Sequence, residues 1–400
     1  MIHAAGTRVR RLFLISAGVA TALGCEPNGD APTARTVSQD SAGVIVARSA
    51  AQDAPFPGTV TLERYLDPPE SGFFEVGHAL AADSSGHLFV LDKGNHRLLV
   101  FDAAGAFQMA MGRRGGGPGE MERPQALVVS GGGVAYVHDM ARRGFIRFTR
   151  DGQPLDGTLA AQHFFGGEDV HVHEGMITHV RGARAESGDQ LLQLVSYAGS
   201  EQPRILAVRT RLEGKNVTFP GCPLTMGAME PFLGPKIAWS AHGAHVAINP
   251  VDEYRIEVYR ADTLSLIIER PLAGVPVTPE LAAMAAVNEF GAEGFVLTYP
   301  TGRCTIDPKD MVAARGFAPS TAVVRRMAMA PGGEVWVQRL TVEGQEPIDV
   351  FDGAGRYLGT LPTGTVFPDA FLGDSRYASA VRDTLDEERV AVFMLERTGG

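Results

Sequence analysis

Hydrophobic and polar positions recur along this chain with a period of about 45 residues. In each copy a turn opens a hydrophobic strand, a polar loop follows, and a second hydrophobic strand ends near an Asp-x-x-Gly turn. The clearest copy spans residues 86–105, with Asp102 and Gly105 in that turn. Four short strands repeated at this period are typical of β-propeller blades, so the pattern predicts an all-β propeller.

Six copies are recognised by their second and third strands, which predicts a six-bladed β-propeller over residues 58–400. A seventh blade would have to lie in the long spacers 209–234 and 272–320. The paired segments are 86–92 with 95–102, 133–139 with 145–148, 175–180 with 191–195, 244–249 with 254–259, 333–337 with 348–352, and 376–381 with 389–395.

The last copy lacks an outer strand, because the sequence stops after its third strand. A free sheet edge promotes aggregation, and closing the ring removes it. Residues 59–65 alternate between polar and apolar and precede the first blade. We therefore expect this segment to pair with residues 389–395 and complete the last blade.

The second spacer contains a short helical insertion around 278–287. Thr278 is a suitable N-cap, Pro279 fits the first helical turn, and the alanine-rich run that follows favours a helix.

The N-terminus has the pattern of an export signal. Three arginines precede an apolar run over residues 12–23, which is too short for a membrane-spanning helix. Residues 22–25 resemble a bacterial lipobox, in which Cys25 is lipidated, and the alternative is secretion without a lipid. We expect a signal peptide over 1–24, then the lipidated cysteine and a flexible tether over 25–57, in which residues 44–46 could still dock as a strand.

Composition narrows the function classes. The chain has 36 basic and 46 acidic residues, and removal of residues 1–24 takes away three arginines and leaves a net charge of −13. An acidic surface disfavours binding to nucleic acid. The 48 glycines suit an all-β protein with many turns, and the hydrophobic content of 44% supports a full core.

A family resemblance follows from residues 88–105 and the glycine-rich loop 111–120. The order strand, Asp, loop, Asn-His-Arg, strand, Phe-Asp resembles NHL-type repeats, particularly those of bacterial six-bladed propeller lipoproteins. This resemblance implies a binding or interaction role outside the cytoplasm. Propeller enzymes such as lactonases and amidating lyases are also similar, so the fold alone does not choose a function.

The glycine-rich loop is a candidate anion site. Consecutive glycines free backbone N–H groups to face an anion, and two guanidinium groups could clamp a carboxylate or phosphate. The alternative is a tight connection between blades, in which glycine supplies positive φ. The candidate residues are Arg113, Arg114, Gly115, Gly116 and Gly117.

Polar turns between second and third strands form a second candidate, because they gather on one face of the ring. They could recognise a polar ligand or a protein loop, or they could cap turns and pair across blades. His96, Arg142 and Arg143 are the ligand-binding candidates, and Asp92 and Asp102 have a structural pattern.

His171 and His173 share one face of a strand, so both imidazoles could bind one metal ion. With Asn249 they form the candidate metal site, for calcium or zinc, if the protein binds a metal at all. The alternative is that these histidines are hydrogen-bonded or lie on the surface.

If Cys25 is lipidated, Cys222 and Cys304 remain as a pair that an oxidising compartment could bond. A disulfide closing a loop of this length would stabilise the fold by about 4 kcal/mol.

Two functions remain open at the level of sequence. The first is a lipid-anchored, monomeric scaffold on the periplasmic or outer-membrane side of the cell envelope, which binds an envelope protein or a small polar ligand without catalysis or a cofactor. The second is a metal-assisted hydrolase or lyase in the central channel, which needs three or four converging ligands.

Overall fold

The computed structural model describes residues 36–41, 43–69, 72–160, 169–198, 202–219, 221–223, 225–261, 263–299, 302–341, 343–385 and 387–398. The predicted signal peptide, the predicted lipidation site at Cys25 and the first part of the predicted tether lie outside these residues.

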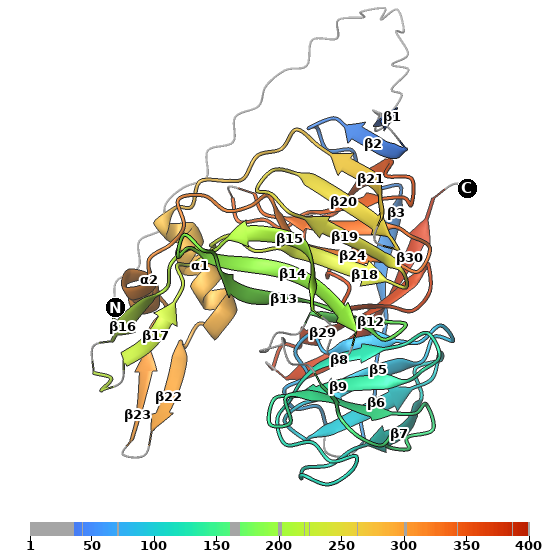
Figure 1. Ribbon diagram of the computed structural model, residues 1–400, viewed down its shortest axis with the longest axis vertical. Coiled ribbons are helices and arrows are strands. Elements are labelled where there is room, and N and C mark those ends of the chain that lie inside the picture. Colours follow the sequence, from blue (N-terminus) through green and yellow to red (C-terminus); the bar gives the residue numbers. More distant parts are fainter. Residues whose placement is uncertain are drawn as a thin grey trace, which may run out of the picture. The chain divides into compact units, whose positions relative to one another are not determined.

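Six antiparallel sheets form the six blades that the sequence predicts (Figure 1). Blade 1 contains β4 (Leu80–Ala82), β5 (Leu88–Asp92), β6 (Arg97–Phe101) and β7 (Phe107–Met111). Blade 2 contains β8 (Pro124–Val129), β9 (Ala135–Asp139), β10 (Gly144–Phe148) and β11 (Leu159–Ala160). Blade 3 contains β12 (Val170–His173), β13 (Met176–Arg184), β14 (Gln190–Ala198) and β15 (Arg204–Thr210).

The second half of the ring repeats this arrangement. Blade 4 contains β18 (Ala238–His242), β19 (His245–Asn249), β20 (Arg255–Arg260) and β21 (Thr263–Glu269). Blade 5 contains β24 (Val324–Met329), β25 (Val335–Arg339), β26 (Ile348–Phe351) and β27 (Tyr357–Leu361). Blade 6 contains β28 (Ala370–Phe371), β29 (Arg376–Arg382), β30 (Glu388–Arg397) and β3 (Gly58–Tyr65).

The ring closes as predicted, because β3 pairs antiparallel with β30 and places Thr59 opposite Glu396. The burial of each strand matches its pattern of hydrophobic residues. Every residue of β5 is buried, since both faces of this strand pack against neighbouring sheets, whereas three of the five residues of the outer strand β7 are exposed. Inner strands therefore have continuous hydrophobic runs, and outer strands do not.

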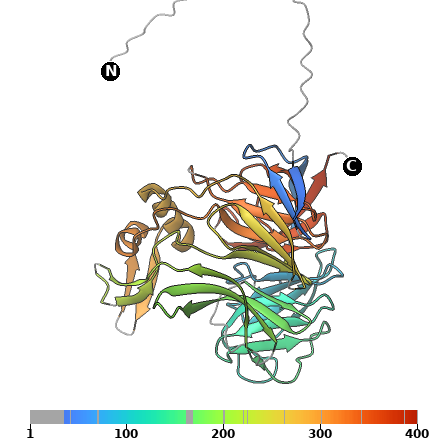
Figure 2. The ribbon, with the colours of Figure 1, turned by 45° about the horizontal axis from the view of Figure 1, so that its top comes forward.

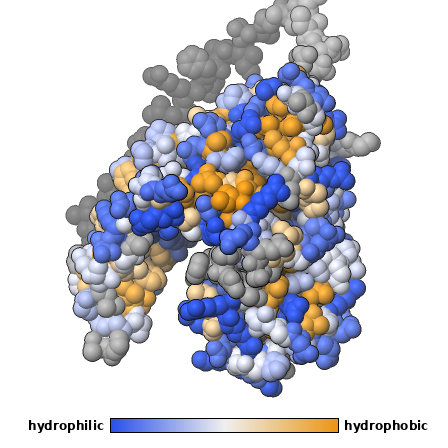
Figure 3. Space-filling view, in the orientation of Figure 1, coloured by the Kyte–Doolittle hydropathy of each residue, from blue (hydrophilic) through white to orange (hydrophobic). Residues whose placement is uncertain are grey.

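An accessory unit is built from the two spacers. It contains the hairpin β16 (Lys215–Thr218) and β17 (Thr225–Met229), the helix α1 (Pro279–Phe290), the hairpin β22 (Phe295–Tyr299) and β23 (Gly302–Ile306), and the helix α2 (Pro308–Arg315). The predicted helix is confirmed as α1, whose N-cap Thr278 accepts a hydrogen bond from the Leu281 amide. On the side of the molecule that Figure 3 shows, a hydrophobic patch at the lower left lies over the hairpins β16–β17 and β22–β23.

The segment before β3 differs from the predicted tether. β1 (Thr36–Ser41) and β2 (Val44–Ser49) form a hairpin, and β2 runs parallel to the outer strand β21 of blade 4 (Figures 1 and 2). Val46 and Ala47 of β2 are buried there. The described residues of 36–57 are thus part of the propeller, because the short apolar run 44–46 docks as a strand and covers an exposed sheet edge.

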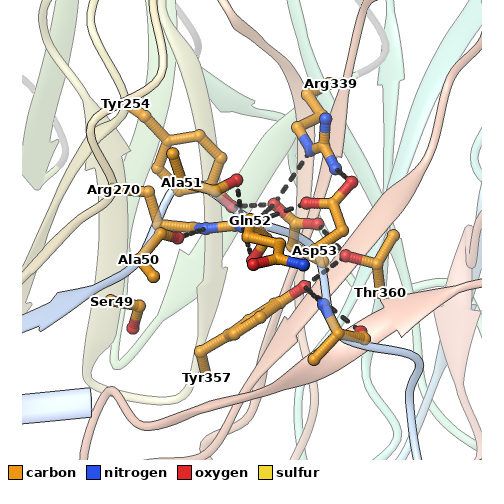
Figure 4. A network of polar contacts seen from close by, with 12 residues as sticks. Ser49, Ala50, Ala51, Gln52, Asp53, Tyr254, Arg270, Arg339, Tyr357 and Thr360 are labelled. Carbon is orange, nitrogen blue, oxygen red and sulfur yellow. Dashed lines mark hydrogen bonds and ion pairs between the residues drawn. The ribbon is translucent and has the colours of Figure 1, made fainter. Parts of the chain in front are cut away.

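A buried ionic network fastens this segment to blades 4 and 5 (Figure 4). The Arg270 side chain is fully buried and donates to the carbonyls of Ala50, Ala51 and Gln52. It also pairs with Asp53 at 3.0 Å and with Asp349, itself fully buried, at 2.6 Å. The segment therefore supplies both backbone and carboxylate partners for a guanidinium that lies between two blades.

Candidate functional site

One face of the ring carries two kinds of loop. In a four-stranded antiparallel blade, the turn between strands 2 and 3 leaves at the same end as the connection to the next blade. We call this the loop face. Its described parts include the turns 93–96, 140–143 and 383–385, the connection 112–123, and residues 66–69 and 72–79 of the connection into blade 1.

Buried aspartates join turns and connections on the loop face. Asp139, at the end of β9, accepts hydrogen bonds from the amides of Glu122 and Arg123 in the connection and from those of Ala141 and Arg142 in the turn. Asp92 has the same place in blade 1. It accepts from the Phe74 amide, from the Asn95 side chain and from the Arg97 guanidinium. Both aspartates hold the connection that enters their own blade.

Asn249 occupies the equivalent position at the end of β19. Its side-chain amide donates to the carbonyls of Glu253 and Arg255, both at 2.9 Å, and the residue is fully buried. The side chain that the sequence suggested as a metal ligand therefore holds the turn of blade 4.

The glycine-rich connection 112–123 is filled by its own carboxylate. Glu120 accepts from the Gly117 amide at 2.7 Å and pairs with Arg113 at 2.7 Å. A Cβ atom at Gly115 would lie 2.2 Å from a Glu120 carboxylate oxygen, so the bare backbone makes room for this carboxylate. The Gly117 amide and Arg113 lower the pKa of Glu120. The predicted anion cradle thus binds an internal anion.

Other candidates of the loop face support the same connection. Arg142 donates to the carbonyls of Gly117 and Glu120. The His96 ring nitrogens lie 3.2 Å from the carbonyls of Gly94 and Glu122. Arg114 and Arg143 are exposed. The structure therefore brings Arg113, the glycine-rich loop, Arg142 and His96 together at the junction of blades 1 and 2.

The junction of blades 6 and 1 is open. A groove of about 550 Å³ lies between described residues of the connection into blade 1 and the facing ends of β29 and β30. The connection contributes a mainly apolar wall with Pro68, Phe73 and Phe74, and the opposite wall is charged. Its charged residues are Arg382, Glu387, Glu388 and Arg389. Volumes of 300–1,000 Å³ are usual for ligand sites.

The candidate residues predicted from the sequence do not include Phe74, which lines this groove, or Leu385, which lies in the turn between β29 and β30. With exposures of 63% and 77%, they are the two most exposed large apolar side chains among the described residues. The signal that could have found Phe74 is the pair Phe73-Phe74 in a connection rich in proline, glycine and acidic residues, outside any strand pattern. Leu385 lies in a polar turn and carries no such signal.

The two candidate metal-binding histidines lie at the inner strand of blade 3, with ring centroids 6.3 Å apart. The His171 Nε2 lies 3.0 Å from the Gly243 carbonyl and links blade 3 to blade 4. Burial lowers the pKa of His171 to about 4, against the effect of this hydrogen bond, and the neighbouring His173 and His242 lower it further.

These histidines do not converge with Asn249, because β12 ends on the face opposite to the loop face, whereas Asn249 lies on the loop face. Within the part of the chain that the structure describes, no three His, Cys, Asp or Glu side chains are grouped to hold a metal ion. The three-residue metal site expected from the sequence is therefore wrong in its geometry.

Cys222 and Cys304 form a disulfide with Cα atoms 5.6 Å apart. It joins the β16–β17 hairpin to β23 and so links the two spacers of the accessory unit. Around it lies a small core that includes Phe219, Phe232 and Met311.

Residues 76–158 match a family described as 6-bladed beta-propeller, DUF5128. No curated protein matches the sequence. Among the described residues, no helix combines the length and apolar character needed to cross a membrane.

Solved structures with similar folds have low identity. A Bacteroides fragilis protein provisionally described as exported is 12% identical, with a TM-score of 0.46, over 88% of this chain and all of its own. A gluconolactonase from Xanthomonas campestris is 14% identical, with a TM-score of 0.35, over 87% of this chain and 98% of its own. A calcium-binding protein, regucalcin, from Agrobacterium tumefaciens is 13% identical, with a TM-score of 0.37, over 86% and 96%. These likenesses assign no activity to this chain.

Proposed function

We propose that this protein is an exported six-bladed propeller, anchored to the cell envelope through a lipid on Cys25, that works as a non-catalytic scaffold for a partner protein. The partner binds the loop face at the junction of blades 6 and 1. Buried Asp92 holds the connection into blade 1, and Asp383 accepts hydrogen bonds from the Leu385 and Glu387 amides in the turn after β29. Loops fixed on a rigid scaffold in this way commonly carry binding function.

One observation carries the proposal. Phe74 and Leu385 are the two most exposed large apolar side chains among the described residues. Phe74 lines the groove, and Leu385 lies in the turn between β29 and β30, next to the charged wall. Exposed apolar side chains that gather around a concave surface mark interaction sites more often than isolated ones do. At the junction of blades 1 and 2, by contrast, Arg113 and Glu120 pair with each other.

Site-specific photo-crosslinking in intact cells tests this function. The full chain would carry a photo-reactive amino acid at position 385 or, as a matched control, at Val208, which is exposed on the outer strand β15. We expect a discrete crosslinked product from position 385 only. In the same cells, Cys25→Ser should move the protein from the membrane fraction to the soluble fraction.

Equal crosslinking from both positions, or crosslinking from Val208 alone, would contradict a partner on the loop face. If Cys25→Ser stays in the membrane fraction, the lipid anchor is contradicted. The location of the binding face is tested separately, by the crosslinking experiment.

A further inference from the structure

The groove between blades 6 and 1 has a fixed aromatic wall. The Phe74 amide donates to Asp92 at 2.9 Å, and the Phe74 carbonyl accepts from the Gly94 amide at 2.9 Å. The ring lies over Gly94, where a Cβ atom would come within 2.0 Å of it. The backbone thus holds in place a ring that is 63% exposed.

The opposite wall carries arginines that are already paired. Arg389 pairs with Asp383 at 3.1 Å and with Glu387 at 3.4 Å, and Arg382 pairs with Glu388 at 3.7 Å. Because each guanidinium already has a carboxylate partner, an acidic ligand would have to compete with these internal pairs.

Accessible carboxylates remain on both sides of the groove. Glu75 is exposed, and its carboxylate makes no hydrogen bond or ion pair within the described part of the chain. Its backbone has φ of 60°, a conformation that is uncommon for residues other than glycine. The Glu387 side chain is 62% exposed although it contacts Arg389.

The charged residues that line the groove are three glutamates and two arginines, and Asp383 adds a further negative charge beside them. The groove therefore carries a net negative charge. A cation over an aromatic face with carboxylates nearby is stabilised both by the ring and by the charges.

From these contacts we infer that the groove binds a segment of a partner protein in which a lysine or arginine is flanked by an apolar side chain. The basic group pairs with Glu75 and Glu387, and the apolar side chain packs on Phe74. This inference rests on the proposed scaffold function and names the chemistry of its partner.

A fluorescence polarisation experiment on the purified full chain tests it. The probes are a labelled pentapeptide with a central lysine between two leucines and the same peptide with a central glutamate. We expect the lysine peptide to bind at least tenfold more tightly. Phe74→Ser and the double variant Glu75→Gln, Glu387→Gln should each weaken it at least fivefold.

Phe107→Ser is the matched control, since Phe107 is 40% exposed on β7, outside the groove. It should leave the affinity unchanged, and circular dichroism melting curves of all variants should stay at the wild-type value. Absence of binding, equal binding of the two peptides, or an equal loss with Phe107→Ser would overturn the inference.

The two proposals fail in different ways. If a partner crosslinks at position 385 but the lysine peptide does not bind, the scaffold function stands and the partner chemistry is wrong. If the lysine peptide binds as expected but no crosslinked product forms in cells, the groove chemistry stands and the scaffold function fails.

Discussion

The connections into blade 2 and into blade 1 have the same place in the fold and opposite surfaces. In both, a buried aspartate at the end of the second strand holds the connection, Asp139 in blade 2 and Asp92 in blade 1. At blade 2 the loop folds around its own Glu120. At blade 1 it leaves Phe74 and Glu75 exposed beside a groove.

The two connections show that polar side chains already bonded within the protein must be distinguished from those that a partner could bind. Arg113 and Arg142 look like ligand-binding residues in the sequence, but their partners are a carboxylate and two carbonyls of the same connection. A hydrogen bond already made internally has to be broken before a ligand can use it. The less conspicuous connection is the one that offers unused surface to a partner.

The largest loss of stability is expected from a substitution in the buried ionic network between blades 4 and 5. Asp349 accepts from Arg270, Arg339, Tyr254 and Thr360, and its side chain is fully buried. Asp349→Ala leaves buried guanidinium charge poorly compensated and should lower the free energy of unfolding by about 3–5 kcal/mol. Urea unfolding at neutral pH measures this loss.

Asp352→Ala is the control for that variant, because Asp352 caps the exposed turn after β26 through the amides of Ala354 and Arg356. Its loss should cost only about 1 kcal/mol. If both variants lowered the free energy of unfolding by the same amount, the buried network around Asp349 would stabilise the fold no more than an exposed turn does.

A smaller effect, on the pH dependence of stability, is expected from His171 at the junction of blades 3 and 4. Burial lowers the pKa of His171 from its ordinary value of 6.5 to about 4 in the folded state. Between these pH values the unfolded chain binds a proton that the folded chain does not, so stability falls as the pH falls from 6.5 towards 4. His171→Gln should make this decline shallower, as measured by urea midpoints from pH 7.5 to 4.5. Parallel curves for wild type and variant would show that His171 does not contribute.

The smallest change in stability, and the sharpest test of the comparison, is expected from Glu120→Ala. This variant removes the internal anion and leaves the Gly117 amide and Arg113 without it. We expect inorganic phosphate to shift the Gly117 amide resonance in the variant and not in the wild type. Glu122→Ala removes a neighbouring carboxylate of the same connection and should respond like the wild type. A phosphate response in the wild type would mean that the cradle is open after all.

Much of the fold could be predicted because its signals are local. The continuous apolar run of β5, the alternation in residues 59–65 and the Thr278-Pro279 helix start each lie within a few residues of one another. The segment 36–57 was expected to be mostly a flexible tether in which residues 44–46 could dock as a strand, whereas its described residues join the ring. Its anchor is Arg270, more than 200 residues away, and no local pattern shows that contact.

The candidate site was less predictable for a related reason. His171, His173 and Asn249 have suitable chemistry, but strand direction puts them at opposite ends of the blades. Residue type shows what a side chain can do, whereas its partners depend on how neighbouring blades pack.

The amino-acid sequence by itself determined the number of blades, the pairing of the closing strand and the helical insertion, because hydrophobic periodicity is set by short-range geometry. Only the tertiary structure decided that Glu120 fills its own loop, that residues 36–57 join the ring, and that the groove between blades 6 and 1 stays open. Those outcomes depend on contacts between segments far apart in the chain, which form only when the blades assemble.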